Sequence, residues 1–254
     1  MLGQLYLPTK RVLGSPITAL SFDDQIQIML DWASQRESRA VCVANVHMVM
    51  EAHWHPSFAD VLEKADLVTP DGMPVVWMMR LLGTKKQERV AGMDILLALC
   101  HLAQLHQISI FFLGSCQKIL EPMERRLRSE FPYLPIAGIE PLPFRPLTPA
   151  EDKALMQKIN ASRAGLVFVS LGCPKQEYWI AQHREQISAV MIGLGGAFPV
   201  YARIHNWAPQ WVRKSGLEWL YRLLQEPRRL WRRYTKTIPA FIWLAWRQLR
   251  NRHH

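Results

Sequence analysis

Several patterns that would assign this chain to a common class of protein are absent. No segment approaches the roughly 20 apolar residues that a membrane-spanning helix needs, since the longest candidate, Ile238–Trp246, has nine residues and contains a proline. The N-terminus lacks the basic segment and apolar segment that together mark a secretory signal peptide. We therefore expect a globular protein that stays in the cytoplasm and has no transmembrane helix.

Short motifs for metal, phosphate and dinucleotide binding are also missing. The sequence has no P-loop, no H-E-x-x-H, no D-x-D and no C-x-x-C, and its four cysteines lie far apart. The glycines of Gly193–Ala197 do not form G-x-G-x-x-G and come late in the chain, which argues against a dehydrogenase. His53 and His55 are a weak metal signal, for which a surface position is the simpler interpretation. We expect no cofactor, no metal site and no disulfide, with the cysteines acting as small buried apolar residues.

Acidic side chains are scarce near the C-terminus, so the net charge of +10 lies there. Residues 203–254 hold 12 of the 31 Lys and Arg residues and two of the 21 acids, which leaves 19 of each sign in residues 1–202. They also hold six of the ten tryptophans. Arginine pairs with phosphate and indole has an apolar body with a polar edge, so this composition favours an anionic membrane surface. A solvated basic helix and a nucleic-acid-binding tail are the alternatives.

Strand-like and helix-like segments alternate up to Gly196, and only helical segments follow. This alternation predicts βαβ units and a parallel sheet covered by helices on both faces. The Pro-rich stretch Pro132–Pro149 is expected to be a loop. The expected strands are Ala40–Asn45, Asp66–Thr69, Ile108–Leu113, Leu166–Leu171 and Ala189–Leu194; the expected helices are Phe22–Gln35, Pro74–Leu82, Met93–Gln107, Lys118–Glu130, Pro149–Asn160, Lys175–Arg184, Gly216–Gln225, Pro227–Lys236 and Ala240–Arg250.

Candidate site residues follow the expected strands, because ligands of open α/β sheets lie at the carboxyl ends of the strands. Asp71 lies in a Pro-Asp-Gly sequence, which is either an ordinary turn or a rigid position for a general base. Lys175 opens a helix whose N-terminus is either unremarkable or a phosphate site. Arg89 is either a surface charge or a phosphate clamp.

Seven segments, in order, resemble one family of enzymes. They are Val41–Asn45, Ala65–Gly72, Glu88–Gly92, Phe112–Gly114, Leu171–Glu177, Gly193–Phe198 and Gly216–Leu223. Together they resemble the WecG/TagA/CpsF glycosyltransferases (glycosyltransferase family 26), over about residues 10 to 235. The Asp-Gly, Pro-Lys-Gln-Glu and Gly-Leu-Glu-Trp-Leu blocks make the combination specific.

The resemblance implies an inverting transfer of a sugar from a UDP-sugar to a sugar linked to undecaprenyl diphosphate. It implies that Asp71 is the base that deprotonates the acceptor hydroxyl. It also implies that Arg222, Arg229 and Arg232 stabilise the leaving diphosphate in place of a metal. The residues expected to bind the substrates are Asn45, Gly72, Arg89, Gly114, Gly172, Lys175, Gln176, Glu177 and Gly195.

Three positions depart from the family pattern. Val43 stands where Thr is frequent, Pro199 where Asp is usual, and Trp207 where Arg is usual. These departures leave the donor open among an N-acetylmannosamine-type sugar, glucose and a uronic acid.

The sequence therefore predicts an α/β core with a Rossmann-like parallel sheet and flanking helices, residues 1–195. A basic, Trp-rich helical appendage that docks on a membrane, residues 196–254, is expected to follow. The predicted function is metal-independent glycosyl transfer in bacterial polysaccharide or cell-envelope synthesis, at the inner face of the plasma membrane. The expected partners are a UDP-sugar, a lipid-linked acceptor and an anionic membrane, with no nucleic acid; homo-oligomerisation is left open. The alternatives are a nucleic-acid-modifying enzyme with a phosphate-binding tail and a non-catalytic membrane adaptor, but the scarcity of Lys in the tail favours the membrane.

Overall fold

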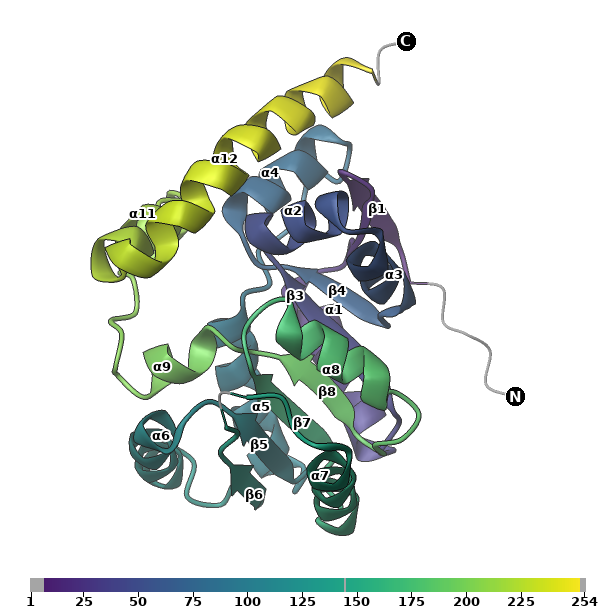
Figure 1. Cartoon of the computed structure of the whole chain (residues 1–254), viewed down its shortest axis with the longest axis vertical. Helices are drawn as coiled ribbons and strands as arrows, with labels where there is room; N and C mark the ends of the chain where they lie inside the picture. The colour runs from purple at the N-terminus through teal and green to yellow at the C-terminus, as the bar shows by residue number, and fades with distance from the viewer. Residues whose placement is uncertain (1–6, 144, 252–254) are drawn as a thin grey trace. The chain divides into compact units, whose positions relative to one another are not determined.

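The computed structural model describes residues 7–143 and 145–251, which form an α/β fold (Figure 1). The strands are β1 (Thr9–Val12), β2 (Ser15–Thr18), β3 (Arg39–Ala44), β4 (Leu67–Pro70), β5 (Ile110–Gly114), β6 (Ile136–Glu140), β7 (Leu166–Ser170) and β8 (Val190–Gly193). The helices are α1 (Phe22–Ser34), α2 (Val46–Trp54), α3 (Pro56–Lys64), α4 (Met73–Leu81), α5 (Gly92–Leu105), α6 (Gln117–Glu130), α7 (Pro149–Ala161), α8 (Lys175–His183), α9 (Ala197–Tyr201), α10 (Gln210–Lys214), α11 (Glu218–Gln225) and α12 (Pro227–Arg250).

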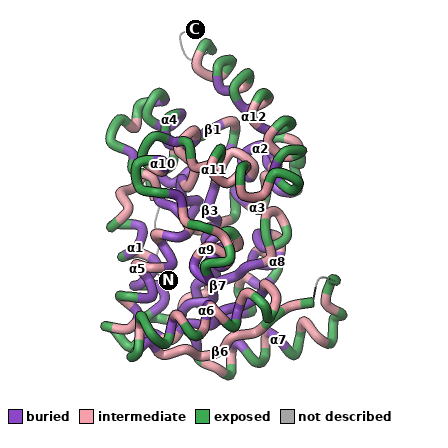
Figure 2. The backbone as a smooth tube through the Cα atoms, turned by 90° about the vertical axis from the view of Figure 1, so that its left-hand side faces the viewer, coloured by how far each residue is buried: buried purple, intermediate pink, exposed green. Residues whose placement is uncertain are grey.

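The predicted parallel sheet is confirmed. It has six strands in the order β4-β3-β8-β7-β5-β6, and β3, β8, β7, β5 and β6 pair in parallel register. Every residue of β4, β5, β7 and β8 is buried, and Figure 2 shows β3 and β7 in the colour of buried residues. Burial on both faces explains why these strands are continuously apolar rather than alternating.

The chain divides into two compact units, which we describe separately. Unit 1 comprises the residues up to Asp24, Ala44–Ala91, and the residues from Ala208 onward; unit 2 comprises Gln25–Val43 and Gly92–Trp207. This division follows contacts between residues. The expected division at residue 195, between an α/β core and a C-terminal appendage, stays a prediction.

In unit 1, the C-terminal helix packs on the N-terminal elements. Helix α12 contacts α2, and Figure 1 shows it in yellow, running past α2 and α4. Leu230, Phe241 and Ala245 are buried on its inner face. Near its end, Gln248 accepts a hydrogen bond from the backbone N–H of Leu13 (3.0 Å) and donates one to the carbonyl of Arg11 (2.9 Å). The last helix is therefore an integral part of unit 1.

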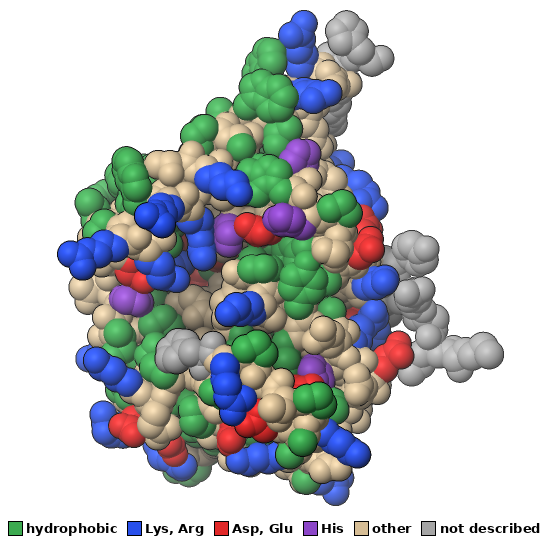
Figure 3. All heavy atoms as spheres, in the orientation of Figure 1, with side chains coloured by type: hydrophobic (Ala, Val, Ile, Leu, Met, Phe, Trp, Pro, Cys, Tyr) green, Lys and Arg blue, Asp and Glu red, His purple; other side chains and the backbone are tan. Residues whose placement is uncertain are grey.

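The outer surface of this helix is both basic and aromatic. Trp231, Trp243 and Trp246 are 61%, 56% and 56% exposed. Figure 3 shows hydrophobic and basic side chains mixed along the surface that α12 forms. No helix among the described residues combines the length and the apolar character needed to cross a bilayer.

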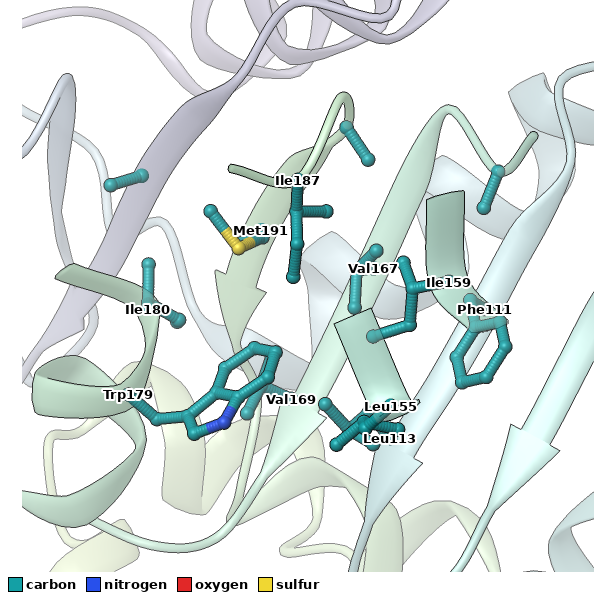
Figure 4. Packing of buried hydrophobic residues seen from close by; sticks show 13 residues of the cluster. Phe111, Leu113, Leu155, Ile159, Val167, Val169, Trp179, Ile180, Ile187 and Met191 are labelled. Carbon is teal, nitrogen blue, oxygen red and sulfur yellow. The ribbon is translucent and has the colours of Figure 1, made fainter. Parts of the chain in front are cut away.

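Unit 2 has an apolar core on each face of its strands. On one face, Phe111, Leu113, Val167 and Val169 pack against side chains of α7 and α8 (Figure 4). The neighbouring residues along the same strands point to the other face, as the alternation of a strand requires. There the ring of Phe112 lies 5.5 Å from that of Phe168 and 6.1 Å from that of Phe198 in α9.

The structure corrects the sequence prediction in two places. The stretch expected to be a loop, Pro132–Pro149, contains the edge strand β6. The residues of β6 are all half-buried, so β6 lacks the continuous apolar sequence from which the central strands were predicted. The expected break at Pro239 is also wrong, because α12 continues through it. Leu230 before the proline and Phe241 after it are both buried, and this packing keeps the two halves of α12 in one helix. The helix loses one backbone hydrogen bond there, because proline has no N–H to donate.

Several elements were not predicted at all. Helices α2, α3, α9 and α10 lie in segments that the sequence left unassigned. The hairpin of β1 and β2 turns at Leu13 and Gly14, which both have positive φ (49° and 91°). Two-residue hairpin turns of this kind favour Asn-Gly. Because Leu13 stands in place of Asn, the sequence did not indicate a hairpin here. Of the cysteines, Cys42 and Cys100 are buried as expected, whereas Cys116 and Cys173 are half-buried; all four are free thiols.

Candidate active site

The turn after β4 brings three of the predicted site residues together in unit 1. The backbone N–H of Asp71 donates to the carbonyl of Ala44 (2.8 Å), and Gly72 is the N-cap of α4. A Cβ atom at Gly72 would lie 3.5 Å from the Cβ of Asn45, so the turn packs directly against Asn45. The Asn45 side chain accepts a hydrogen bond from the N–H of Met48 (3.2 Å) and caps α2. Asn45 therefore has a structural role as the cap of α2.

Arg89 joins the same region. The neighbouring Val90 donates its N–H to the carbonyl of Pro70 (2.8 Å), at the end of β4. The Arg89 guanidinium forms an ion pair with Glu218, the first residue of α11, and the two side chains are only 15% and 28% exposed. This pair links the residues after β4 to the C-terminal helices of unit 1.

These residues line one cavity of about 550 Å³, within the range of small-molecule sites. Its polar lining comes from the Asp71 turn, from the start of α2, from α11 and from the first part of α12. Its apolar lining comes mostly from α4 and α12, with Val46 of α2 and Trp219 of α11. The polar or glycine residues are Asn45, His47, Asp71, Gly72, Arg89, Gly216, Glu218, Arg222, Arg233, Tyr234 and Thr237.

The arginines of the C-terminal helices occupy different positions. Arg222 and Arg233 line the cavity, whereas Arg229 and Arg232 do not. Arg229 forms an ion pair with Glu226 (Nη2 to Oε1, 2.7 Å), and Arg232 is exposed. Arg222 lies in α11, whereas Arg229, Arg232 and Arg233 all lie in α12, which is a separate helix (Figure 1).

Arg233 is a lining residue that the predicted set lacked. Burial raises the pKa of Tyr234, and the positive charges of Arg222, Arg233 and Arg229 oppose this effect. These three guanidinium groups therefore act electrostatically on the same side chain, so positive charge is concentrated beside the cavity.

A second cluster of predicted residues lies in unit 2, where Gln176 connects two loops. Its Oε1 accepts hydrogen bonds from the N–H of Gly172 (3.1 Å) and the N–H of Gly195 (3.2 Å). A Cβ atom at Gly195 would lie 2.6 Å from that oxygen, so the close approach requires glycine. Gln176 is 5% exposed and thus holds together the loops that follow β7 and β8.

Glu177 lies beneath this connection and is fully buried. Its Oε1 accepts a hydrogen bond from Nε2 of Gln176 (2.7 Å), and its Oε2 makes no hydrogen bond. Burial raises the pKa of Glu177 to about 7, against the lowering effect of the Gln176 amide. Glu177 therefore orients the Gln176 side chain and does not reach the surface.

Lys175 and Gly114 are the remaining predicted site residues in unit 2. Lys175 is exposed at the first position of α8, whose N-cap makes no side-chain hydrogen bond. Gly114 has φ of 89° at the end of β5, which lets the next residue, Ser115, donate its N–H to the carbonyl of Ser170 (2.7 Å). The positions that depart from the family pattern also fall in unit 2. Val43 is buried in β3, and Pro199 is half-buried in α9.

Among the described residues, no three His, Cys, Asp or Glu side chains are grouped so as to hold a metal ion. His53 and His55 are both exposed.

Comparison with known proteins identifies the family. The sequence model of the WecG/TagA/CpsF family of glycosyl transferases matches residues 10–254. The chain belongs to this family. The fold described above, with Asp71 following β4 and the Gln176–Glu177 pair opening α8, is thus the fold of a glycosyltransferase of this family.

Individual relatives carry a more detailed name. One from Bacillus spizizenii is 32% identical over 234 residues, covering 89% of this chain and 88% of the relative. One from Bacillus subtilis is 31% identical, covering 87% and 84%, and one from Staphylococcus aureus is 28% identical, covering 80% and 78%. All three are N-acetylglucosaminyldiphosphoundecaprenol N-acetyl-beta-D-mannosaminyltransferases.

Proposed function

We propose that this protein transfers a sugar, with inversion, from a UDP-sugar to a sugar carried on undecaprenyl diphosphate, in bacterial cell-envelope synthesis. One observation carries the proposal: Asp71, Arg222 and Arg233 line a single cavity of unit 1. An inverting transfer needs a base for the acceptor hydroxyl and positive charge for the departing diphosphate. The cavity contains both kinds of group.

Asp71 is the proposed base. Its backbone is fixed by the hydrogen bond to Ala44, and Gly72 packs against Asn45, so the carboxylate lies on a rigid turn. A base fixed in this way loses little entropy when it meets the acceptor hydroxyl.

Arginine is the proposed source of positive charge, as the resemblance to the family implied. Arg222 and Arg233 are placed best for this role because they line the cavity. Arg229 and Arg232 keep their predicted roles as proposals, but Arg229 must first leave its ion pair with Glu226. We also propose that the loops joined by Gln176 in unit 2 contact the UDP-sugar.

The relatives named above indicate the first substrates to test. Their names specify transfer of N-acetylmannosamine to N-acetylglucosaminyldiphosphoundecaprenol. Val43, Pro199 and Trp207 differ from the family pattern, so glucose and uronic acid donors belong in the same screen.

We propose further that the protein docks on the inner face of the plasma membrane through α11 and α12. Exposed Trp231 and Trp243 alternate there with arginines, and Arg247 stacks on Trp243 with its guanidinium carbon 5.7 Å from the ring centroid. An aromatic ring at the interface with a cation beside it suits anionic lipid headgroups.

The decisive experiment compares Asp71→Asn with Asp60→Asn, a matched change at an exposed position of α3. Loss of a positioned base lowers turnover by about 10²–10⁴-fold, so Asp71→Asn should fall by that amount while UDP-sugar binding persists. Asp60→Asn should behave like the parent. If Asp71→Asn retains the parental rate, Asp71 is not the base, and if no UDP-sugar is transferred to any lipid diphosphate acceptor, the proposed reaction is wrong.

A further inference from the structure

The cavity of unit 1 is more apolar than sugar transfer requires. A sugar, a diphosphate and a catalytic carboxylate are polar, yet most of the lining is hydrocarbon. Helix α4 contributes Trp77, Met78 and Leu81, and α12 contributes Leu230, Ile238, Phe241, Ile242, Ala245, Trp246 and Leu249.

These residues form a continuous stripe along α12. From Ile238 to Leu249 they recur every three or four positions, which is one face of a helix. At about 1.5 Å per residue, this part of the stripe is about 16 Å long. Phe241 and Ala245 are buried, at 5% and 8% exposure, whereas Ile242 and Trp246 are 62% and 56% exposed. The stripe thus has a buried floor and an open rim.

The lining changes from polar to apolar along the same helix. Arg233 lies five residues before the stripe begins, and Arg222 of α11 also lines the cavity. The complementary ligand is an amphiphile with an anionic head beside the arginines and a hydrocarbon chain along α4 and α12. Charge complementarity at one end therefore identifies what covers the apolar residues at the other.

We propose that this apolar stripe, Ile238 to Leu249 with Trp77, Met78 and Leu81, binds the first isoprene units of the lipid-linked acceptor. The proposal rests on the proposed function, and adds to it a binding site for the isoprenoid chain. Holding the chain inside the protein draws the diphosphate and its sugar out of the membrane plane toward Asp71. It also makes the chain, rather than the sugar alone, a determinant of acceptor affinity.

A bilayer surface fits these residues less well than a single chain does. The stripe lines a cavity, whereas Trp231 and Trp243 on the same helix are equally exposed and lie outside it. A bilayer contacts projecting side chains, and a cavity takes up a single molecule.

Trp246 and Trp243 form a matched pair for the test. Both are 56% exposed, both lie in α12, and each has an arginine four residues later over its ring. Only Trp246 lines the cavity. Truncation to Ala therefore removes a similar exposed ring in each case, and alanine favours the helix.

The experiment measures binding of two soluble diphosphates by titration calorimetry on the full chain, without lipid or detergent. Farnesyl diphosphate has ten more carbons than isopentenyl diphosphate but the same head. Burial of those carbons should make the longer ligand bind at least about tenfold more tightly. Trp246→Ala should weaken farnesyl diphosphate binding by about tenfold and leave isopentenyl diphosphate unchanged, while Trp243→Ala should change neither.

Three results would overturn the proposal: equal affinity for the two ligands, no effect of Trp246→Ala, or equal effects of the two substitutions. Equal effects would indicate a general surface, and a change in oligomeric state with Trp246→Ala would indicate that a second copy covers the stripe. Because the titration does not depend on turnover, it separates this proposal from the proposed reaction. Chain-dependent binding without sugar transfer would retain the chain site and reject the reaction.

Discussion

Replacing Glu177 with Gln should change how the stability of the protein depends on pH. Glu177 is fully buried and its pKa is raised from 4.5 to about 7, chiefly by burial. Between these two values the folded protein holds a proton that the unfolded chain has released. The free energy of unfolding of the parent should therefore decrease as pH rises from 4.5 to 7, and the decrease should be complete above pH 7.

The size of this effect follows from the pKa difference. Each pKa unit corresponds to about 1.4 kcal/mol, so the ionised carboxylate costs the folded state about 3 kcal/mol above pH 7. The glutamine variant does not ionise and escapes this cost. It keeps an oxygen that can accept from the Gln176 amide, but its own amide needs a partner at the position of Oε2, which lowers stability by about 1–3 kcal/mol at every pH.

The measurement is urea unfolding of the parent and of Glu177→Gln at several pH values from 5 to 8. The difference between variant and parent should shift by about 2–3 kcal/mol in favour of the variant across this range. Glu185→Gln, at an exposed position just after α8, is the control and should show a flat difference. A flat difference for Glu177→Gln as well would refute the reasoning, because it would mean that this buried carboxyl does not titrate in that range.

Three further predictions concern catalysis and docking. Arg222→Ala should lower turnover by about 10²-fold or more, whereas Arg229→Ala should have a smaller effect because Arg229 is paired with Glu226. Steady-state rates test this prediction, with Arg228→Ala as a control at an exposed position. Equal losses of turnover for the Arg222 and Arg229 variants would contradict it. EDTA should leave the rate of transfer unchanged if arginines supply the positive charge. The mechanism is wrong if EDTA abolishes activity and added Mg²⁺ or Mn²⁺ restores it. The full chain should co-sediment with anionic liposomes. Binding should weaken but persist at high salt, because salt does not screen the apolar burial of tryptophan. Complete release by salt would show that charge alone holds the protein on the liposomes.

The central strands and most helices could be predicted because their signals are local. Strands buried on both faces need continuous apolar runs, and βα alternation forces a parallel arrangement. Elements whose local sequence pattern is weak were not predicted, because prediction depends on such patterns. Strand β6 is half-buried at the sheet edge, and the hairpin turn at Leu13 lacks the residues that usually mark it.

The candidate site could be predicted in part. Asp71, Asn45, Gly72, Arg89 and Arg222 were chosen from separate motifs, and the structure places all of them around one cavity. The roles of Gln176 and Glu177 could not be predicted, because both were expected to face substrate. Only the fold shows that Gln176 joins two loops and that Glu177 lies buried beneath it.

The sequence by itself determined the fold class, the family and the concentration of basic and aromatic residues near the C-terminus. These properties depend on residue type and spacing, which can be counted along the chain. Tertiary structure alone decided that α12 continues through Pro239, that Arg233 rather than Arg232 lines the cavity, and that an apolar stripe continues from the arginines. Each depends on which face of a helix meets its neighbours, and that is set by packing between segments far apart in the sequence.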